Sequence, residues 1–319
     1  MEHTNKKALP AAGSTGFWLV ALGAALWGIG PLFRIHLLDY MTSTQVVLIE
    51  HLLVCLVAVP ILWINRSELK NLRLKHVFAL LVISWGGSAL ATVIFTIALS
   101  SGDLNAVVLL QKMQPIFAIL LARLILKETL PKRFVFFFII AIVGTYLLTF
   151  GFTIPFGTNS EWIKIGSLLS LLAAALWGGS TVMGRLLLGQ AQYKTVTSLR
   201  YVLALPLLLI MTWMEGASMN LPQAGADLAS IGVNLLAQAL LPGLLSLLLY
   251  YKGLSSTKAS MATLAELSFP MMGVLVNWIA FGQLVTPAQL IGFVLIWTTL
   301  FIFARQQQQS SQQLVSRTT

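Results

Sequence analysis

The stretch Ala24-Ala25-Leu26-Trp27-Gly28 occurs twice in this chain, and its second copy is Ala174-Ala175-Leu176-Trp177-Gly178. The copies are separated by 150 positions, and each lies within a long apolar run. Self-similarity at a fixed offset indicates a repeated architecture, so the sequence predicts two related halves.

The composition indicates a membrane protein. Of the 319 residues, 57% are hydrophobic and only 9% are charged, and the mean hydropathy is +0.86. A soluble domain of this length could not bury so much apolar surface, so we expect a polytopic membrane protein. The net charge of +10 does not indicate nucleic-acid binding, because the basic residues are scattered between apolar runs. In membrane proteins, an internal repeat is typical of transporters whose site lies between the halves.

Apolar runs recur along the whole chain. A spanning helix needs about 20 mostly apolar residues, and ten runs of this kind are present. Five lie within residues 17–152 and five within residues 161–304, and these ranges form the two predicted repeats. Residues 1–16 form a predicted cytoplasmic segment, and the glutamine-rich residues 305–319 a predicted disordered tail. The runs cover residues 17–37, 44–64, 76–99, 104–126, 134–152, 161–187, 195–214, 228–251, 259–281 and 288–304.

Loop charges predict the orientation, because short cytoplasmic loops carry an excess of lysine and arginine. With the N-terminus inside, the cytoplasmic segments are basic and the opposite loops are mainly acidic, so both termini are predicted to be cytoplasmic. The cations inside would be Lys6, Lys7, Arg66, Lys70, Arg73, Lys75, Lys127, Lys132, Arg133, Lys194, Lys252, Lys258 and Arg305, and the anions outside Asp39, Asp103, Glu161, Glu215 and Asp227.

The repeat extends beyond the Trp-Gly copies. Residues 95–100 match residues 250–255 at an offset of 155, and Pro115 matches Pro270 at the same offset. Because each repeat has an odd number of spans, the second repeat enters the bilayer from the opposite face. The sequence therefore predicts an all-α fold of ten transmembrane helices, arranged as two inverted five-helix repeats.

These motifs resemble those of the EamA family of the drug/metabolite transporter superfamily. The resemblance rests on the paired Ala-Leu-Trp-Gly motifs, the proline in each fourth helix and the turn Lys127-Glu128-Thr129, and it covers about residues 17–304. It implies ten helices, an inverted repeat and a central cavity lined by the first, third and fourth helices of each half. It also implies export or uptake of small metabolites by alternating access.

Two positions depart from the family pattern. The glutamate that follows the fourth helix, Glu128, is replaced by Gln283 at the equivalent position of the second repeat. The arginine that is common in the family's second helix is present in the second half as Arg200, but its first-half equivalent is Glu50. The role of that arginine in other members therefore cannot be assumed for the first half.

Four ionisable residues lie within predicted spans, where a charge is costly unless it is paired or hydrated. Helix rise places Glu50 and Lys112 roughly 9 and 12 Å from the outer face. By the same estimate, Arg200 and Glu266 lie roughly 8 and 11 Å from the inner face. We therefore expect Glu50 to pair with Lys112, and Glu266 with Arg200, either for ion coupling or as structural pairs. His51, beside Glu50, is either a packing residue or a proton relay.

Glu266 is the strongest candidate for binding substrate or a proton. It stands four residues before Pro270, and its repeat mate Gln111 stands four residues before Pro115. A proline leaves the carbonyl four residues earlier without its usual donor, so each proline is a predicted hinge with a free carbonyl nearby. Burial disfavours the charged form of a carboxylate. Glu266 would then bind a proton or a substrate amino group in one state, unless it only neutralises Arg200.

Aromatic residues supply a candidate wall of the cavity. Trp27 and Trp177 lie near the middle of their spans, whereas tryptophan usually marks the membrane interface. They either line the cavity or pack against the glycines beside them, which let helices approach closely. Trp85, Phe95 and Tyr250 are further candidates for the same wall.

The sequence as a whole predicts a secondary transporter that moves a small metabolite, such as an amino acid or an amine, across the cytoplasmic membrane by alternating access. The alternative is a membrane-embedded enzyme or scaffold. The sequence lacks the common metalloprotease, P-loop and serine hydrolase motifs, and its single cysteine, Cys55, excludes a multi-cysteine metal site. We expect no cofactor and no metal, and as partners a small molecule and the lipid bilayer. Proton coupling is left open, and the protein is expected to be a monomer or a homodimer.

Overall fold

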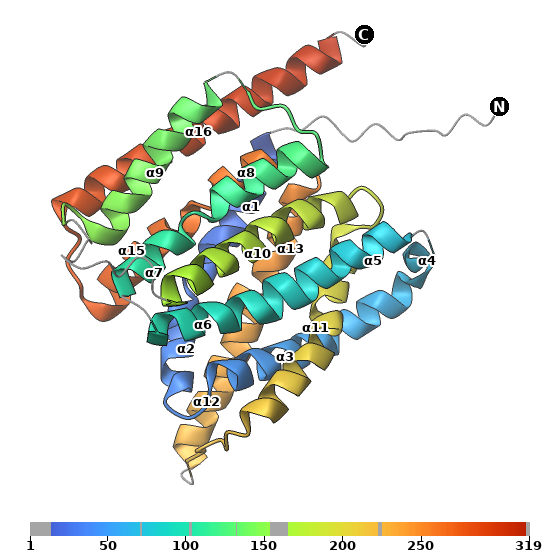
Figure 1. Cartoon of the computed structure of the whole chain (residues 1–319), viewed down its shortest axis with the longest axis vertical. Helices are drawn as coiled ribbons and strands as arrows, with labels where there is room; N and C mark the ends of the chain where they lie inside the picture. Colours follow the sequence, from blue (N-terminus) through green and yellow to red (C-terminus); the bar gives the residue numbers. More distant parts are fainter. Residues whose placement is uncertain are drawn as a thin grey trace.

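The computed structural model describes residues 14–70, 72–101, 104–131, 133–153, 165–222 and 225–316. Within these residues every regular element is a helix, and the helices pack together as a bundle (Figure 1). Of the predicted N-terminal segment 1–16, only the last three positions belong to the described residues. The prediction of an all-α polytopic membrane protein is confirmed.

The helices of the described residues follow one another in chain order. In the first half they are α1 (Ser14–Trp27), α2 (Gly30–Leu38), α3 (Ser43–Ile64), α4 (Arg66–Leu69), α5 (Leu74–Leu81), η1 (Val82–Leu90), α6 (Ala91–Ser101), α7 (Leu104–Gln111), α8 (Gln114–Ile125) and α9 (Phe134–Phe150). In the second half they are α10 (Ile165–Leu187), α11 (Tyr193–Glu215), α12 (Gly225–Gln238), η3 (Ala239–Leu245), α13 (Ser246–Leu254), α14 (Ala259–Ala265), α15 (Ser268–Phe281) and α16 (Pro287–Ser316).

Nine helical segments of the described chain are long and apolar enough to cross a membrane. The remaining predicted run, 134–152, forms the apolar helix α9, which has 17 residues. At about 1.5 Å per residue, α9 is about 26 Å long, slightly less than the hydrocarbon core of a bilayer. It ends at Gly151, whose φ of 64° lies in the left-handed region that favours glycine.

Two spans are interrupted beside the prolines that the sequence marks as hinges. The fourth run divides into α7 and α8 at Lys112 and Met113, and the ninth divides into α14 and α15 at Glu266 and Leu267. The carbonyl of Glu266 is not free, because it accepts a hydrogen bond of 3.0 Å from the amide of Phe269. The prediction of a free carbonyl at Glu266 is therefore wrong, since the chain tightens into a turn that brings a closer donor.

The first span contains a break that the sequence analysis did not predict. α1 ends at Trp27 and α2 begins at Gly30, with Pro31 in its first turn. The second Trp-Gly copy lies instead inside the continuous α10. The difference follows from the position equivalent to Pro31, which is Thr181, because threonine keeps the backbone donor that proline lacks.

The third and eighth spans each contain a π-helix, a second feature that the sequence analysis did not predict. The two segments, η1 and η3, end at Leu90 and Leu245, which are related by the offset of 155. Pro242 lies inside η3 and removes one backbone donor there. π-helical turns are frequent at functional sites, and η1 carries the candidate residue Trp85.

Glycines allow two close helix crossings that correspond in the two halves. A β-carbon at Gly28 would lie 2.8 Å from the carbonyl oxygen of Phe269 in α15, and one at Gly178 would lie 2.9 Å from that of Gln114 in α8. Gly178 is 150 positions after Gly28, and Phe269 is 155 positions after Gln114. The crossing of α1 with α15 is thus made by the same contact as that of α10 with α8.

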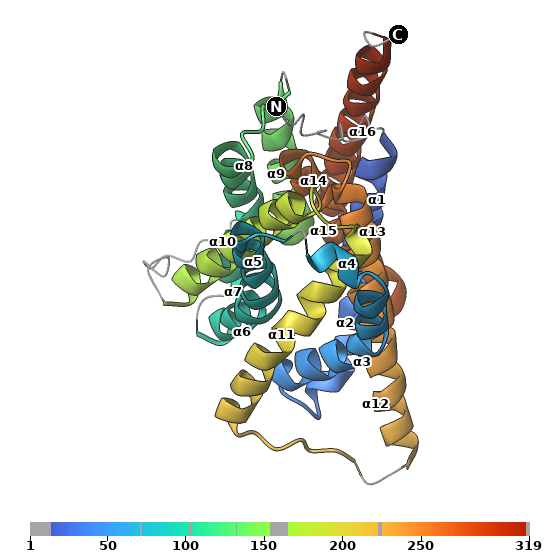
Figure 2. The same ribbon diagram turned by 90° about the vertical axis from the view of Figure 1, so that its right-hand side faces the viewer.

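The helix pair α9 and α16 lies at one end of the molecule, and α3, α11 and α12 lie towards the other (Figures 1 and 2). α9 and α16 run in opposite directions. Phe134, at the start of α9, contacts Phe303 with ring centroids 5.5 Å apart, whereas Gln289, near the start of α16, donates to the carbonyl of Leu148.

α16 is longer than the predicted tenth run. It continues to Ser316, so residues 305–316 of the tail expected to be disordered are helical, and residues 317–319 lie outside the described part of the chain. The extension follows from composition, because glutamine has a favourable helix propensity.

Candidate functional site

Glu266, in the turn between α14 and α15, lies at the centre of a hydrogen-bonded cluster. Its Oε1 accepts from the hydroxyl of Tyr250 at 2.6 Å and from that of Thr181 at 3.1 Å. Its Oε2 accepts from Nε2 of Gln114 at 2.8 Å. Glu266 and Tyr250 are only 9% and 3% exposed, whereas Gln114 is half-buried. Three neutral donors therefore bind a buried carboxylate.

The helix breaks position the members of this cluster. Gln114 is the first residue of α8, directly before Pro115, and therefore lies at the break in the fourth span. Thr181 is contributed by α10, which has no break there, and Tyr250 by α13. Gln114 belongs to the first half and the other members to the second, so the cluster joins the halves.

Trp27, at the end of α1, packs beside the cluster. Its ring centroid lies 5.1 Å from that of Tyr250, and the indole is half-buried. The structure therefore brings together three of the residues that the sequence selects, namely Trp27, Tyr250 and Glu266. Gln111 ends α7 and is half-buried, but the amide that reaches Glu266 is that of Gln114.

Arg200 donates to neutral hydroxyl groups instead of pairing with Glu266. Its Nε donates to Oγ of Ser88 at 2.7 Å, and its Nη1 donates to Oγ of Ser180 at 3.1 Å. Nη1 also donates to the hydroxyl of Tyr251 at 2.8 Å. The predicted ion pair of Arg200 with Glu266 is therefore wrong.

Two adjacent tyrosines of α13 explain why these charges do not pair. Tyr250 binds the carboxylate of Glu266, and Tyr251 binds the guanidinium of Arg200. The two rings are 5.5 Å apart. The side chains of Tyr250 and Tyr251 therefore separate the carboxylate of Glu266 from the guanidinium of Arg200. They also connect the hydrogen-bonded clusters around these two residues.

The second Trp-Gly copy contacts η1 one residue before Ser88, which binds Arg200. Trp177 donates from Nε1 to the carbonyl of Gly87 at 3.0 Å, and its ring lies 5.4 Å from that of Phe95. Trp85 is 40% exposed and donates to the carbonyl of Leu203 at 2.8 Å, so it joins η1 to α11. Trp177 and Phe95 thus form one aromatic pair, and Trp85 makes a different contact.

Glu50 forms an ion pair with Arg34, with 3.1 Å between Oε2 and Nη2. With its amide oriented to match its neighbours, Gln238 accepts from Arg34 and donates to the carbonyl of Gly30, both at 3.1 Å. The predicted pairing of Glu50 with Lys112 is therefore wrong. Lys112 instead places Nζ 5.3 Å from the centroid of the Phe269 ring.

His51 packs against α11 beside this ion pair. Its Nδ1 lies 2.8 Å from the carbonyl oxygen of Val47, and its ring is 4.8 Å from that of Tyr201. Within the described part of the chain, its Nε2 is buried and has no hydrogen-bond partner. These contacts fit a packing role for His51, and they leave its Nε2 available to bind a proton.

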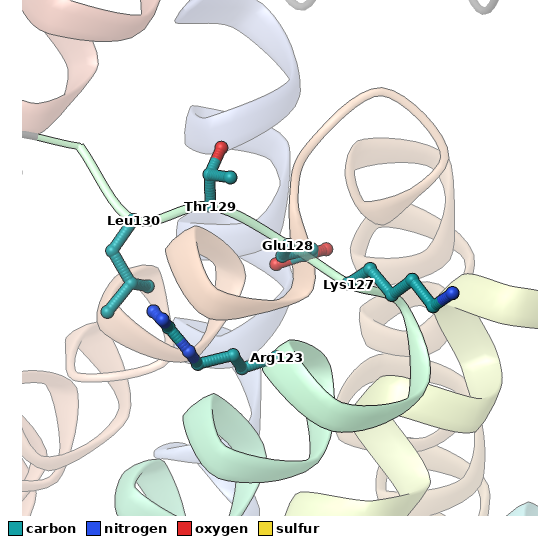
Figure 3. A pocket seen from close by; sticks show the side chains of 5 residues that line it. All are labelled: Arg123, Lys127, Glu128, Thr129 and Leu130. Carbon is teal, nitrogen blue, oxygen red and sulfur yellow. The ribbon is translucent and has the colours of Figure 1, made fainter.

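The turn Lys127-Glu128-Thr129 forms a separate contact between the halves. Oε1 of Glu128 accepts from the amide of Ala259 at 2.8 Å, and Oε2 accepts from the amide and hydroxyl of Ser260 at 3.0 and 2.7 Å. Lys258 donates to the carbonyl of Thr129 at 2.9 Å. Glu128 therefore caps the first turn of α14, beside an open pocket of about 360 Å³ (Figure 3). The pocket is lined by Arg123, Lys127, Glu128, Thr129 and Leu130.

Several residues of these clusters were missed by the sequence analysis although signals for them exist. Gln114 directly precedes the hinge proline, and Ser180 and Thr181 follow the second Trp-Gly copy after one residue, Gly179. Arg34 is a cation in the outer part of the first run, so the depth estimate applied to Glu50 would also have applied to it. Among the described residues, no group of three or more His, Cys, Asp or Glu side chains could hold a metal ion.

Comparison with known proteins identifies the relatives of this chain. The model of the EamA-like transporter family matches residues 14–150 and 164–305. A protein named Riboflavin transporter ImpX, from Fusobacterium nucleatum subsp. nucleatum, is 35% identical over 290 residues, which are 88% of this chain and 94% of that protein. A protein named Riboflavin transporter, from Brucella anthropi, is 28% identical over 172 residues, which are 54% of this chain and 57% of that protein.

A solved crystal structure, described only as that of a protein, has the same fold. It matches with a TM-score of 0.74 at 15% identity and covers 92% of this chain and 99% of its own. At this identity the match supports the fold alone. The family match, in contrast, extends over both halves and favours a transporter over a membrane-embedded enzyme or scaffold. The chain is a multi-pass membrane transporter and belongs to the EamA-like transporter family.

Proposed function

We propose that this protein carries riboflavin, or a compound with the same isoalloxazine ring, across the cytoplasmic membrane by alternating access. The observation that carries the proposal is 35% identity to Riboflavin transporter ImpX across 88% of the chain. The relative from Brucella anthropi is named for the same substrate. The proposed substrate is thus a flavin and not the amino acid or amine that Glu266 alone suggests.

The described clusters suit a flat ring with a polyhydroxyl chain. Trp27 and Trp177 are both half-buried indoles, and a planar heteroaromatic ring can stack on such a surface. Arg200 and the serine hydroxyls around it offer donors and acceptors for a polyol. Glu266 is the proposed substrate- or proton-binding carboxylate, because it lies where the halves meet.

We propose that transport uses ten spans in two inverted five-helix units, residues 17–152 and 161–304. The matching contacts of Gly28 with Phe269 and of Gly178 with Gln114 support this symmetry, as does the twofold match of the family model. In alternating access the two units rock about the site between them. The helices interrupted at Pro115 and Pro270 act as the gates.

Uptake by riboflavin-auxotrophic bacteria tests the proposed function. Expression of this chain is expected to restore growth at low external riboflavin and to cause accumulation of labelled riboflavin. A labelled amino acid and a labelled amine, supplied to the same cells, measure the alternative substrates. Accumulation of either of these without accumulation of riboflavin would contradict the proposal.

A matched pair of variants controls for expression. Glu266→Ala removes the acceptor that joins the halves and is expected to abolish uptake. Gln283→Ala changes an exposed residue after the end of α15, whereas Glu266 lies before its start. This variant is expected to leave uptake unchanged. Immunoblots of the membrane fraction establish that both variants are present in equal amounts.

A further inference from the structure

Gln114 and Glu266 present an unused donor beside an unused acceptor. Nε2 of Gln114 carries two hydrogens, and one of them is donated to Oε2 of Glu266 at 2.8 Å. Among the described residues, Oε2 accepts this one hydrogen bond, whereas Oε1 accepts from both Tyr250 and Thr181. A carboxylate oxygen accepts about two hydrogen bonds. One N–H and one oxygen lone pair therefore remain next to each other.

Burial indicates from which side a ligand would reach this pair. Glu266 and Tyr250 are buried, whereas Gln114 is half-buried, so the carboxylate is approached along its Gln114 edge. Trp27 is also half-buried and packs on Tyr250, with ring centroids 5.1 Å apart. The donor, the acceptor and a partly exposed aromatic surface therefore belong to one site.

A cyclic amide is complementary to this arrangement. Its N–H can donate to the carboxylate of Glu266 while its adjacent C=O accepts from the amide of Gln114. An amine would use only the carboxylate, because it has no acceptor for the second N–H of Gln114. Riboflavin has such an edge in its flat ring system, where the N3–H group is flanked by two carbonyls.

We propose that Glu266 and Gln114 recognise the imide edge of riboflavin. Glu266 accepts from N3–H, Gln114 donates to a neighbouring carbonyl, and Trp27 contacts the face of the ring. This inference rests on the proposed flavin transport and assigns its specificity to a contact shared by the two halves. The hydrogen bond between Gln114 and Glu266 is retained, because Gln114 binds the flavin with its second N–H and Glu266 with the remaining lone pair of Oε2.

Binding of two flavins to the purified wild-type protein tests this assignment. Riboflavin and N3-methylriboflavin have the same ring face and the same ribityl chain, but the methylated compound lacks the N3–H donor. Binding is followed by quenching of flavin fluorescence. N3-methylriboflavin is expected to bind about tenfold more weakly or worse, because it has no N–H to donate to the remaining lone pair of Oε2 of Glu266.

The outcomes separate the recognition from the transport function. Equal affinities for the two flavins would overturn the assignment of N3–H to Glu266 and leave riboflavin transport standing. Binding of neither flavin would contradict the proposed function itself. Because this comparison uses the wild-type protein, it does not depend on the folding of a variant.

Variants locate the discrimination at the two side chains. In Glu266→Gln the ratio of the two affinities is expected to fall towards one, because the acceptor for N3–H is weakened. Gln114→Leu is expected to weaken riboflavin binding about tenfold, because it removes one of two contacts. Gln283→Leu, at an exposed position, is the matched control and should change neither affinity. A Glu266→Gln protein that keeps its melting temperature and the full ratio would contradict the assignment.

Discussion

Glu50 and Arg200 occupy equivalent positions in the two halves but carry opposite charges. Each contacts the π-helix of the other half. Arg200 donates to Ser88 in η1, and Oε1 of Glu50 lies 3.1 Å from where a β-carbon at Gly243 in η3 would be. Ser88 and Gly243 are themselves related by the offset of 155. The repeat therefore preserves the geometry of a polar contact while the residues that make it differ.

The ion pair of Arg34 with Glu50 gives a prediction for stability. Arg34→Leu leaves a buried carboxylate without its cation, so we expect a loss of about 2 kcal/mol, seen as a lower melting temperature in detergent. The double variant Arg34→Leu/Glu50→Leu should be more stable than Arg34→Leu, because no charge is left unpaired. Lys112→Leu provides the control, and its effect should be additive with that of Glu50→Leu. Coupling of Glu50 with Lys112 instead would show that the pairing is misassigned.

The positions of residues along the chain predicted part of the site, but they could not predict which side chains form hydrogen bonds or ion pairs with one another. Glu266, Trp27 and Tyr250 were selected from repeat offsets and depth, and they do lie together. Depth gives the height of a residue in the bilayer and not the direction in which its side chain points. Glu50 therefore pairs with Arg34 rather than Lys112, and two adjacent tyrosines separate Glu266 from Arg200.

At the scale of elements, apolar runs and prolines predicted most of the helices and the breaks at Pro115 and Pro270. The π-helices were not predictable from hydrophobicity, because η1 and η3 are as apolar as the α-helices that they continue. The break at Pro31 was missed because Pro31 lies within the apolar run 17–37, which is long enough for one span. Local proline chemistry outweighed the similarity of the halves there.

The glycine crossings predict which small residues are intolerant of a methyl group. Gly28→Ala and Gly178→Ala would each place a β-carbon within 3 Å of a backbone atom of the crossing helix, and we expect losses of about 1–3 kcal/mol. Gly273→Ala, in α15, meets nothing within 4 Å and should be neutral or slightly stabilising. Melting temperatures of the three purified variants measure the difference. If Gly28→Ala were as stable as Gly273→Ala, the crossing of α1 with α15 would be looser than described.

The cap on α14 gives a second prediction at this scale. Glu128→Ala removes the acceptor for the amides of Ala259 and Ser260, so we expect a loss of about 1 kcal/mol. The repeat-equivalent change Gln283→Ala should have little effect, because that side chain is exposed. Thermal unfolding of both variants measures the difference. Equal melting temperatures would indicate that the amides find another partner.

For the whole molecule, the loop charges predict which ends face the cytoplasm. Cys55, the single cysteine, is 8% exposed in α3, so replacing it with serine allows cysteines to be placed elsewhere. In that background, Asp39→Cys should react with a membrane-impermeant maleimide on intact cells, and Arg66→Cys only after permeabilisation. Both positions are exposed. The opposite pattern of labelling would reverse the proposed orientation.

Counterflow in proteoliposomes tests the proposal of a flavin carrier most directly. Vesicles that contain the purified protein are loaded with unlabelled riboflavin and diluted into a trace of labelled riboflavin. A carrier that alternates between two faces is expected to concentrate the label transiently inside loaded vesicles, and not inside vesicles without internal riboflavin. Uptake of label that does not depend on internal riboflavin, or no uptake at all, would contradict the account.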